Sequence, residues 1–172
     1  MRTLIYMAML LITFMSVCFV SNARAEGYPD YLWGNKNFIL CGAHRGYACY
    51  VDKSSLVVEE YNPPVYKLAV RVVNVPDADR GNVTPSDTYV CHMFYDWNER
   101  KMYELGHDGK WRYIYPVGPM AKTGHYFVGE MAFYIAYKMK FYGGREWYDE
   151  ETGRLQYPNW SDSLYTLVDK AR

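Results

Sequence analysis

Alternating side chains between Val65 and Val75 (VYKLAVRVVNV) constrain the fold of this chain more than any other feature. In an extended strand, successive side chains point to opposite faces, so one face of this segment carries four apolar side chains in a row. Those side chains are Tyr66, Leu68, Val70 and Val72. Lys67 and Arg71 fall on the other face, with Ala69 and Val73. The pattern predicts a strand that buries one face in a core.

Other segments predict strands on both sides of this one. A hairpin is expected before it, with strands at Phe38–Cys41 and Tyr47–Asp52, and Ser54-Ser55 should interrupt the second strand before it resumes at Leu56–Tyr61. Short turns separate three later segments, which predicts an antiparallel meander. Its strands are Tyr89–Trp97, Arg100–Leu105 and Lys110–Tyr115.

After the meander, the spacing of apolar residues changes from the two-residue period of a strand to that of a helix. From His125 to Tyr142, apolar residues recur at three- and four-residue steps, which predicts an amphipathic helix that ends at Gly143-Gly144. A short C-terminal helix is expected from Ser161 to Asp169. The predicted fold class is therefore α+β, an antiparallel meander sheet with one main amphipathic helix packed on a face.

Residues 1–25 are typical of a secretory signal peptide. A basic start at Arg2 precedes an apolar run from Leu4 to Val20, and Ala23-Arg24-Ala25 supplies the small residues that signal peptidase requires. We expect export to the periplasm, cell surface or medium, with residues 26–172 as a single globular domain and no membrane span after cleavage. The alternative is an uncleaved anchor, because the run approaches the roughly 18 residues that span a bilayer.

Three cysteines remain after the expected cleavage, so at most one disulfide can form within the chain. Cys41 and Cys49 flank a tight connection between two predicted strands, and a disulfide between them is the first candidate. Cys91 could instead pair with either, and all three could be buried thiols.

No pattern predicts catalysis, a metal ion or a cofactor. The chain has no Gly-x-Ser-x-Gly motif, and the side chains of Cys91 and His92 point to opposite faces because the residues are neighbours on a predicted strand. Cys41, His44 and Cys49 offer soft metal ligands but lack a fourth partner. We therefore assign no catalytic residue, no metal ligand and no cofactor.

Aromatic side chains are the unusual part of the composition. They make up 18% of the chain, whereas its 19 basic and 19 acidic residues balance and give no electrostatic basis for nucleic-acid binding. Trp111, Tyr113 and Tyr115 alternate along one predicted strand, and we expect this ladder to be the face buried under the helix. The alternative is a surface that stacks on sugar rings or contacts a protein.

The aromatic C-terminal tail shows neither strand nor helix period, so we expect part of it to be exposed. Exposed Tyr and Trp side chains suit binding because they combine apolar area with a polar tip. The candidate contact residues in the tail and the meander are Trp147, Tyr148, Tyr157, Trp160, Trp97 and Trp111.

The segment Tyr50-Val51-Asp52-Lys53-Ser54-Ser55-Leu56 carries a resemblance to a known family. With the signal peptide, the valine-rich strand and the aromatic meander, it resembles small secreted bacterial proteins with a protein-E-like surface-adhesin domain. Residues 132–143 (AFYIAYKMKFYG) are similar to the end of a helix in other exported bacterial proteins. The resemblance covers residues 38–143 and implies adhesin behaviour, meaning that the protein binds host or matrix proteins, and it assigns no functional residue.

The function expected from the sequence is that of a noncatalytic, adhesin-like binding module of the bacterial envelope or surface. Its expected partner is a surface glycan or a matrix protein. One alternative is an envelope enzyme acting on cell-wall or carbohydrate substrates, which a pocket holding His92 or His125 beside an acidic side chain would favour. A second is a structural subunit that buries its aromatics in a homo-oligomer, since the sequence leaves the oligomeric state open.

Overall fold

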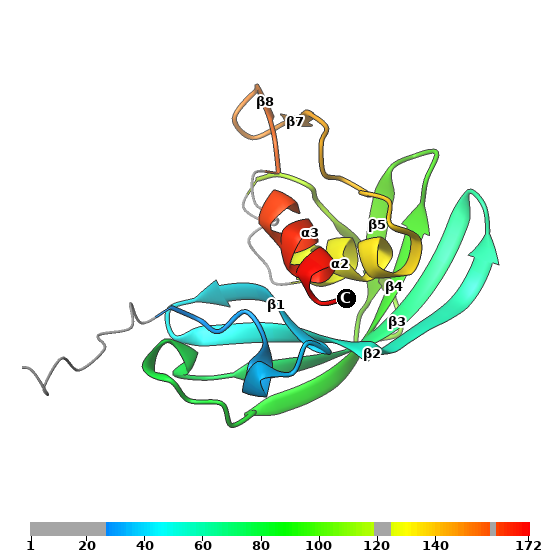
Figure 1. The fold of residues 1–172 in the computed structure, drawn as a ribbon. Helices are drawn as coiled ribbons and strands as arrows, with labels where there is room; N and C mark the ends of the chain where they lie inside the picture. The colour runs from blue at the N-terminus through cyan, green and yellow to red at the C-terminus, as the bar shows by residue number, and fades with distance from the viewer. Residues whose placement is uncertain (1–26, 119–124, 159–160) are drawn as a thin grey trace, which may run out of the picture.

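The computed structural model describes residues 27–118, 125–158 and 161–172. The expected signal peptide, residues 1–25, lies outside the described residues. Within the described part, six strands form one antiparallel sheet whose spatial order follows the chain (Figure 1). This confirms the predicted α+β fold with an antiparallel meander. The strands are β1 (Phe38–His44), β2 (Tyr47–Asn62), β3 (Val65–Val75), β4 (Asp87–Asp96), β5 (Lys101–Leu105) and β6 (Trp111–Ile114).

Strand β3 has the bounds that its alternation predicts, and the four apolar side chains expected on one face are all buried. The opposite face is not uniformly exposed, because Val73 is buried there in a second, smaller apolar cluster. Leu32, from the short 3-10 turn η1 (Leu32–Gly34), joins that cluster. The segment before β1 therefore covers part of the second face, and β3 lies between two apolar layers.

Strand β2 is longer than predicted, because Ser54-Ser55 shifts its register instead of ending it. The pairing of β2 with β3 is irregular between Asp52 and Val57, yet the strand continues to Asn62. The buried Asp52 carboxylate accepts hydrogen bonds from the Ser54 amide at 3.0 Å and the Ser54 hydroxyl at 2.5 Å. It also pairs with Arg71 at 3.3 Å. These side-chain interactions of Asp52 thus stabilise the irregular part of β2, and the strand continues past it.

Helix α2 (His125–Tyr137) lies in the concave face of the bent sheet (Figure 1). It ends five residues earlier than predicted, because Lys138 adopts the left-handed backbone conformation with φ of 56°. Met139 and Tyr142 therefore follow the helix and do not extend its apolar stripe. The helix is also less amphipathic than expected: every residue from 126 to 133 is buried. The sheet covers one side of α2, and helix α3 (Ser161–Lys170) packs against it as well.

Gly129 allows α2 to approach the sheet closely. A Cβ added at this position would lie 2.1 Å from the Met102 sulfur of β5, which is closer than any side-chain contact permits. The Tyr95 hydroxyl of β4 donates a hydrogen bond of 2.8 Å to the Gly129 carbonyl oxygen. The helix is therefore fixed on the sheet at this point by a small residue and a buried tyrosine.

The C-terminal segment confirms one expectation and departs from another. Helix α3 begins at Ser161 as predicted and packs against α2 and β1, and the Tyr31 hydroxyl donates a 3.0 Å hydrogen bond to the Leu167 carbonyl oxygen. Before it, the segment without a predicted period forms a small antiparallel hairpin, β7 (Trp147–Asp149) and β8 (Arg154–Gln156). Three-residue strands are too short to produce a recognisable alternation.

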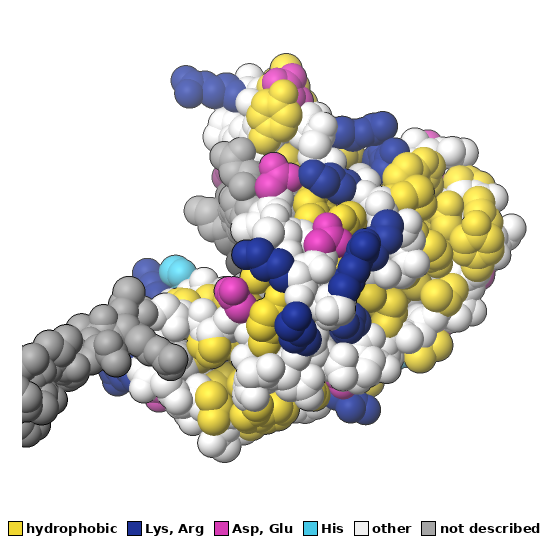
Figure 2. Space-filling model, in the orientation of Figure 1, with side chains coloured by type: hydrophobic (Ala, Val, Ile, Leu, Met, Phe, Trp, Pro, Cys, Tyr) yellow, Lys and Arg dark blue, Asp and Glu magenta, His cyan; other side chains and the backbone are white. Residues whose placement is uncertain are grey.

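The surface near the C-terminus carries many basic side chains, and Figure 2 shows them gathered over α3 and the chain end. Several are paired with acids: Lys140 lies 2.8 Å from Asp162, and Lys138 and Arg172 each lie 3.4 Å from Asp169. Acidic side chains of α3 therefore pair with several of the basic side chains on this face.

Candidate functional site

The six aromatic residues predicted to contact a partner separate into structural and exposed positions. Trp97 is structural: its ring stacks on Phe133 of α2 with 5.6 Å between centroids and an interplanar angle of 15°. The Arg100 guanidinium lies 3.2 Å from the centre of the Trp97 ring. Since the indole ring already packs against Phe133 and Arg100 within the protein, Trp97 is a poor contact residue for a partner.

The aromatic ladder of β6 lies on the face of the sheet opposite α2, so the expectation that it is buried under the helix is wrong. Ile114 faces the core and is 5% exposed, whereas Trp111 and Tyr115 are 40% and 49% exposed. Tyr113 stands between them and packs edge-on against Tyr115, with 4.5 Å between centroids. The predicted alternation along β6 is present, but the face that α2 covers is the one that carries Ile114.

Part of this ladder joins the C-terminal hairpin to form a cleft of about 390 Å³, which we call the aromatic cleft. Tyr113 of β6 and Tyr115, just after this strand, line one side, and Trp147 and Tyr148 of β7 line the other. Trp147 is half-buried, and its indole N–H donates a 3.3 Å hydrogen bond to the carbonyl oxygen of the buried Tyr142. Tyr148 is 62% exposed. Two of the predicted contact residues therefore lie together in the cleft: Trp147 is held by a hydrogen bond and partly buried, and Tyr148 exposes its ring to solvent.

Charged side chains complete the lining of the aromatic cleft. Lys101 lines it and pairs with Glu99 at 3.2 Å, a hydrogen bond that raises the pKa of the lysine. Asp149 at the end of β7, and Glu150 and Glu151 in the turn after it, also line the cleft. The cleft thus offers aromatic faces together with a cation and carboxylates.

The Asp149 carboxylate also organises the turn of the hairpin. It accepts hydrogen bonds from the Thr152 hydroxyl at 2.8 Å, the Glu151 amide at 3.0 Å and the Gln156 amide nitrogen at 2.6 Å. The bond from Thr152 is the main cause that lowers the pKa of Asp149. This carboxylate therefore has a structural role, which leaves Glu150 and Glu151 as the cleft acids exposed to solvent.

Of the other two predicted contact residues in the tail, the structure describes only Tyr157, which does not line the cleft. Tyr157 is 54% exposed, and its hydrogen bond with Glu146 raises its pKa. Trp160 lies outside the described residues. The tail aromatics are thus not a single surface in the described part of the chain.

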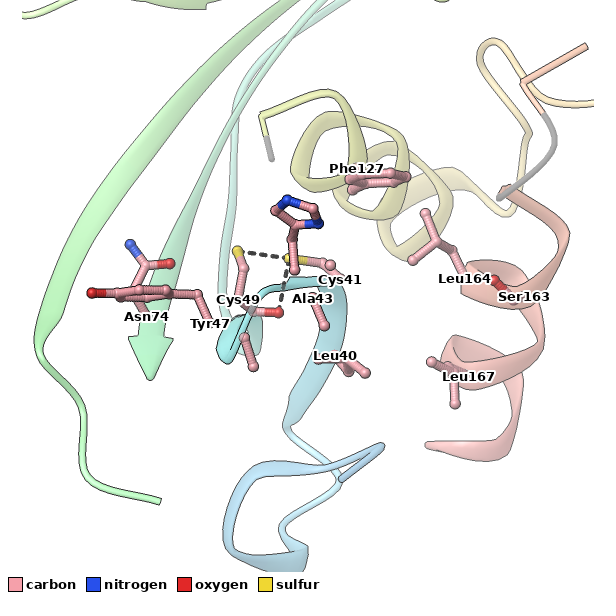
Figure 3. Close-up of a pocket in the computed structure, with 13 residues that line it drawn as sticks. Leu40, Cys41, Ala43, Tyr47, Cys49, Asn74, Phe127, Ser163, Leu164 and Leu167 are labelled. Atoms are coloured by element: carbon pink, nitrogen blue, oxygen red, sulfur yellow. Dashed lines mark hydrogen bonds between the residues drawn. The ribbon is translucent and has the colours of Figure 1, made fainter. Parts of the chain in front are cut away.

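A larger groove of about 780 Å³ lies between the β1–β2 hairpin and the two helices (Figure 3). Its lining is mostly apolar, with Leu40, Ala43 and Tyr47 from the strands and Phe127, Leu164 and Leu167 from the helices. Figure 3 shows Cys41 and Cys49 together on the strand side of the groove, with sulfur atoms 2.8 Å apart. Both are thiols, and burial raises the pKa of Cys41. The sulfurs stand close enough to form the predicted disulfide, which stays a prediction.

A third cluster was missed in the sequence. Cys91, Glu104 and His125 each present one metal-ligating atom, and these atoms all lie within 4.8 Å of one another. Glu104 lies against His125 and raises the pKa of the imidazole, although burial opposes this. Burial and the Glu104 charge raise the pKa of Cys91 to about 12. Because the thiolate is the nucleophile, these surroundings do not suit Cys91 for covalent catalysis.

An enzyme would be favoured by a pocket that holds His92 or His125 beside an acidic side chain, and the His125–Glu104 pair meets only the second part of that condition. An acid does lie beside the histidine, but neither residue lines the aromatic cleft or the apolar groove. His92 lies on the other face of β4, where its Nδ1 is 2.9 Å from a Glu59 carboxylate oxygen and the side chain is 38% exposed. In the described part of the chain, therefore, neither cavity brings a histidine and an acid together in the arrangement that would favour an enzyme.

Comparisons with known proteins give no family for this chain: no family model, no curated protein and no solved structure matches it. What the structure defines is a class, an α+β protein with a six-stranded meander around a buried helix. Within the described residues, no helix combines the length and apolar character needed to cross a membrane.

Proposed function

We propose that this protein is a noncatalytic binding module of the bacterial envelope or surface, and that its aromatic cleft binds a sugar ring of a surface glycan. The observation that carries the proposal is the convergence of Tyr115 and Tyr148 from separate elements on one cleft. A sugar ring has apolar C–H faces that pack on aromatic rings and hydroxyl groups that hydrogen-bond to charged side chains. The cleft supplies both kinds of partner.

The size of the aromatic cleft favours a small ligand over a flat protein surface. About 390 Å³ falls in the lower part of the range of roughly 300–1,000 Å³ that is usual for small-molecule sites. One or two sugar rings fit that volume, whereas a protein partner would need a much larger contact area. The surface glycan is therefore the better supported of the two expected partners.

A binding role fits the chemistry of the cleft better than hydrolysis. Glycosidases need two carboxyl groups on opposite sides of the scissile bond, one of them with a raised pKa. Here Asp149 is held by the hairpin turn, and its pKa is lowered. Glu150 and Glu151 are adjacent in the same turn and exposed. The resemblance to protein-E-like surface adhesins and the expected signal peptide support a surface location for such a binder.

The test compares Tyr115→Ala and Tyr148→Ala with two control variants, Tyr157→Ala and Tyr47→Ala. All four tyrosines are about equally exposed, but the controls lie outside the aromatic cleft. We expect each cleft variant to weaken binding to immobilised bacterial and host glycans by roughly threefold to tenfold, because a lost aromatic contact costs about 0.5–1.5 kcal/mol. The control variants should bind as the unchanged protein does.

Two results would contradict the proposal. Equal losses in the control variants would place the contact elsewhere on the protein. Binding to matrix proteins alone, with no glycan retained, would show that the partner is a protein. Thermal unfolding of each variant checks that the fold is intact, and the exposure of the four side chains leads us to expect only small changes in Tm.

A further inference from the structure

Three potential metal ligands from three separate elements converge under the first turn of α2. Glu104 of β5 is paired with Met93 of β4, so its side chain lies on the same face of the sheet as that of Cys91, two residues from Met93. His125 is the first residue of α2, which covers this face. One ligating atom from each side chain lies within 4.8 Å of the other two.

We propose that Cys91, Glu104 and His125 bind a divalent transition-metal ion of the zinc class, with a fourth position left for water or an exogenous ligand. The set contains one sulfur, one nitrogen and one oxygen ligand. Thiolate and imidazole ligands favour zinc, copper or cobalt over magnesium and calcium, which prefer oxygen alone. Three protein ligands around an open position are the arrangement of a zinc site that binds a further molecule.

The distances suit a single ion. Atoms bound to one tetrahedral Zn²⁺ lie about 3.3–3.7 Å apart, as follows from metal–ligand bonds of about 2.0–2.3 Å. Relative to that geometry, the most distant pair of ligand atoms must approach by about 1 Å, and the Glu104 and His125 atoms, which now lie against each other, must move apart by a similar amount. Side-chain rotation alone supplies such a shift.

The polar atoms at the centre of the cluster also favour an ion. Glu104 Oε2 and His125 Nδ1 are buried against each other, and neither has another hydrogen-bond partner among the described residues. Buried polar atoms without good hydrogen bonds are costly, and a shared cation satisfies both. The partial positive charge at the start of α2 disfavours a cation there, and the negative charges of the Glu104 carboxylate and the Cys91 thiolate offset this effect.

The scaffold holds the ligands in place before an ion arrives. Strand β4 is paired with β3 and β5, and β5 is paired with β4 and β6, so neither ligand strand is at a sheet edge. The Tyr89 ring packs beside the His125 ring at a tilt of 37°, with 6.3 Å between centroids. Ligands on rigid elements lose little freedom on binding, which raises metal affinity.

The site also accounts for the odd cysteine. The sulfur atoms of Cys41 and Cys49 are 2.8 Å apart, so those two residues are the natural pair for a disulfide. Cys91 is then the remaining thiol, and a metal ion would hold it as a thiolate. The proposed ligand set differs from Cys41, His44 and Cys49, the soft ligands that stand close together in the sequence.

The test measures Zn²⁺ binding to purified, chelator-treated protein by calorimetry and by the rise in Tm. We expect one ion per chain and a higher Tm with Zn²⁺. Loss of a residue that only hydrogen-bonds to a metal ligand weakens metal binding by roughly 10–100-fold. Cys91→Ser and His125→Asn each remove a ligand itself, so each should weaken Zn²⁺ binding by more than that. The controls are the double variant Cys41→Ser/Cys49→Ser and the exposed-histidine variant His107→Asn, and both should keep the affinity.

A second measurement needs no variant, so it holds even if a substitution prevents folding. Co²⁺ added to the unchanged protein should produce the near-ultraviolet charge-transfer absorption of a cobalt–thiolate bond, and Zn²⁺ should remove it. Absence of that absorption, or loss of binding in the Cys41→Ser/Cys49→Ser variant with retention in Cys91→Ser, would overturn the proposal. The glycan assay concerns a separate cleft, so either result leaves the proposed function to its own test.

Discussion

The Tyr165 hydroxyl of α3 donates a hydrogen bond to the Glu130 carboxylate of α2, a group with no exposed surface. The same carboxylate accepts backbone hydrogen bonds from Phe141 at 2.8 Å, Tyr142 at 2.9 Å and Gly143 at 3.4 Å. One buried acid therefore ties together both helices and the segment between them. The backbone N–H groups of residues 141–143 lie after the end of α2, and the Glu130 carboxylate supplies the hydrogen-bond acceptor that each of them needs.

Replacement of Glu130 by Gln should destabilise the protein by about 1–3 kcal/mol, because the amide NH₂ would face a backbone N–H donor and leave one donor unpaired. Urea denaturation of both proteins measures the difference. A free energy of unfolding within experimental error of the unchanged protein would show that the carboxylate is not the acceptor described.

The pH dependence of stability gives an independent check on Glu130. Burial raises the pKa of this carboxyl above its ordinary value, and the hydrogen bonds from Tyr165 and the backbone oppose the rise. A raised pKa means that the folded state holds its proton more tightly than the unfolded state does. The contribution of Glu130 to stability is therefore complete below about pH 4.3 and declines as the pH rises through the folded pKa. The Glu130→Gln variant should lack this decline, so parallel pH profiles would contradict the prediction.

Trp97 and Trp111 should respond differently to replacement by Ala. Trp97 packs between Phe133 and Arg100, and its loss should cost about 2–3 kcal/mol, somewhat less than the roughly 3–5 kcal/mol of a fully buried aromatic. Trp111 is 40% exposed and contacts Phe94 at 5.7 Å between centroids, so its loss should cost about 1 kcal/mol or less. Thermal and urea unfolding of the two variants would measure both, and equal losses would contradict the assignment of Trp97 as the structural residue.

Cys41 and Cys49 should form a disulfide when the protein is produced in an oxidising compartment. Their sulfur atoms are 2.8 Å apart, and a bond would close a short loop worth about 2.5 kcal/mol in chain entropy. Mass spectrometry of non-reduced peptides should find these two residues linked and Cys91 unlinked, and reductant should lower the Tm. A linked Cys91 would contradict this pairing.

Asp149 should make the β7–β8 hairpin sensitive to acid. The Thr152 hydrogen bond and those from backbone amides lower the pKa of Asp149, so its contribution is present above the ordinary aspartate pKa and is lost as the pH falls through the lower, folded value. Asp149→Asn should open the hairpin already at neutral pH. Hydrogen exchange at Glu151 and Thr152, compared with the unchanged protein at the same pH, measures the effect, and unaltered protection would refute it.

Strands were the most predictable part of this fold, because a period of two residues survives in the sequence wherever a strand is long. The strand β3 shows this at its predicted bounds. The period does not say which face is covered, so the ladder at Trp111 was assigned to the wrong side. The end of α2 was also misplaced, because Lys138 adopts a left-handed conformation that nothing in the apolar pattern indicates.

The candidate sites were less predictable, since both depend on contacts between distant segments. The sequence predicts Trp147 and Tyr148 as contact residues, but their neighbours in the cleft, Tyr113 and Tyr115, come from β6 and the residues just after it, well before β7 in the chain. The proximity of Glu104 to Cys91 could be predicted from the sequence, because the short turn between β4 and β5 fixes how the two strands pair. His125 reaches them only through the position of α2, which no local pattern specifies.

The order of the sheet along the chain has a consequence for how the molecule assembles. Each strand from β1 to β6 pairs with its neighbour in sequence, so the sheet can grow by closing one short loop after another. Helix α3 is the exception, because it packs on β1 and α2 and receives the Tyr31 hydrogen bond across 136 positions of the chain. Helix α3 packs on α2 and supplies the Tyr165 hydroxyl to Glu130, so burial of the outer side of α2 requires a segment that is distant in the chain from the N-terminal residues it also contacts.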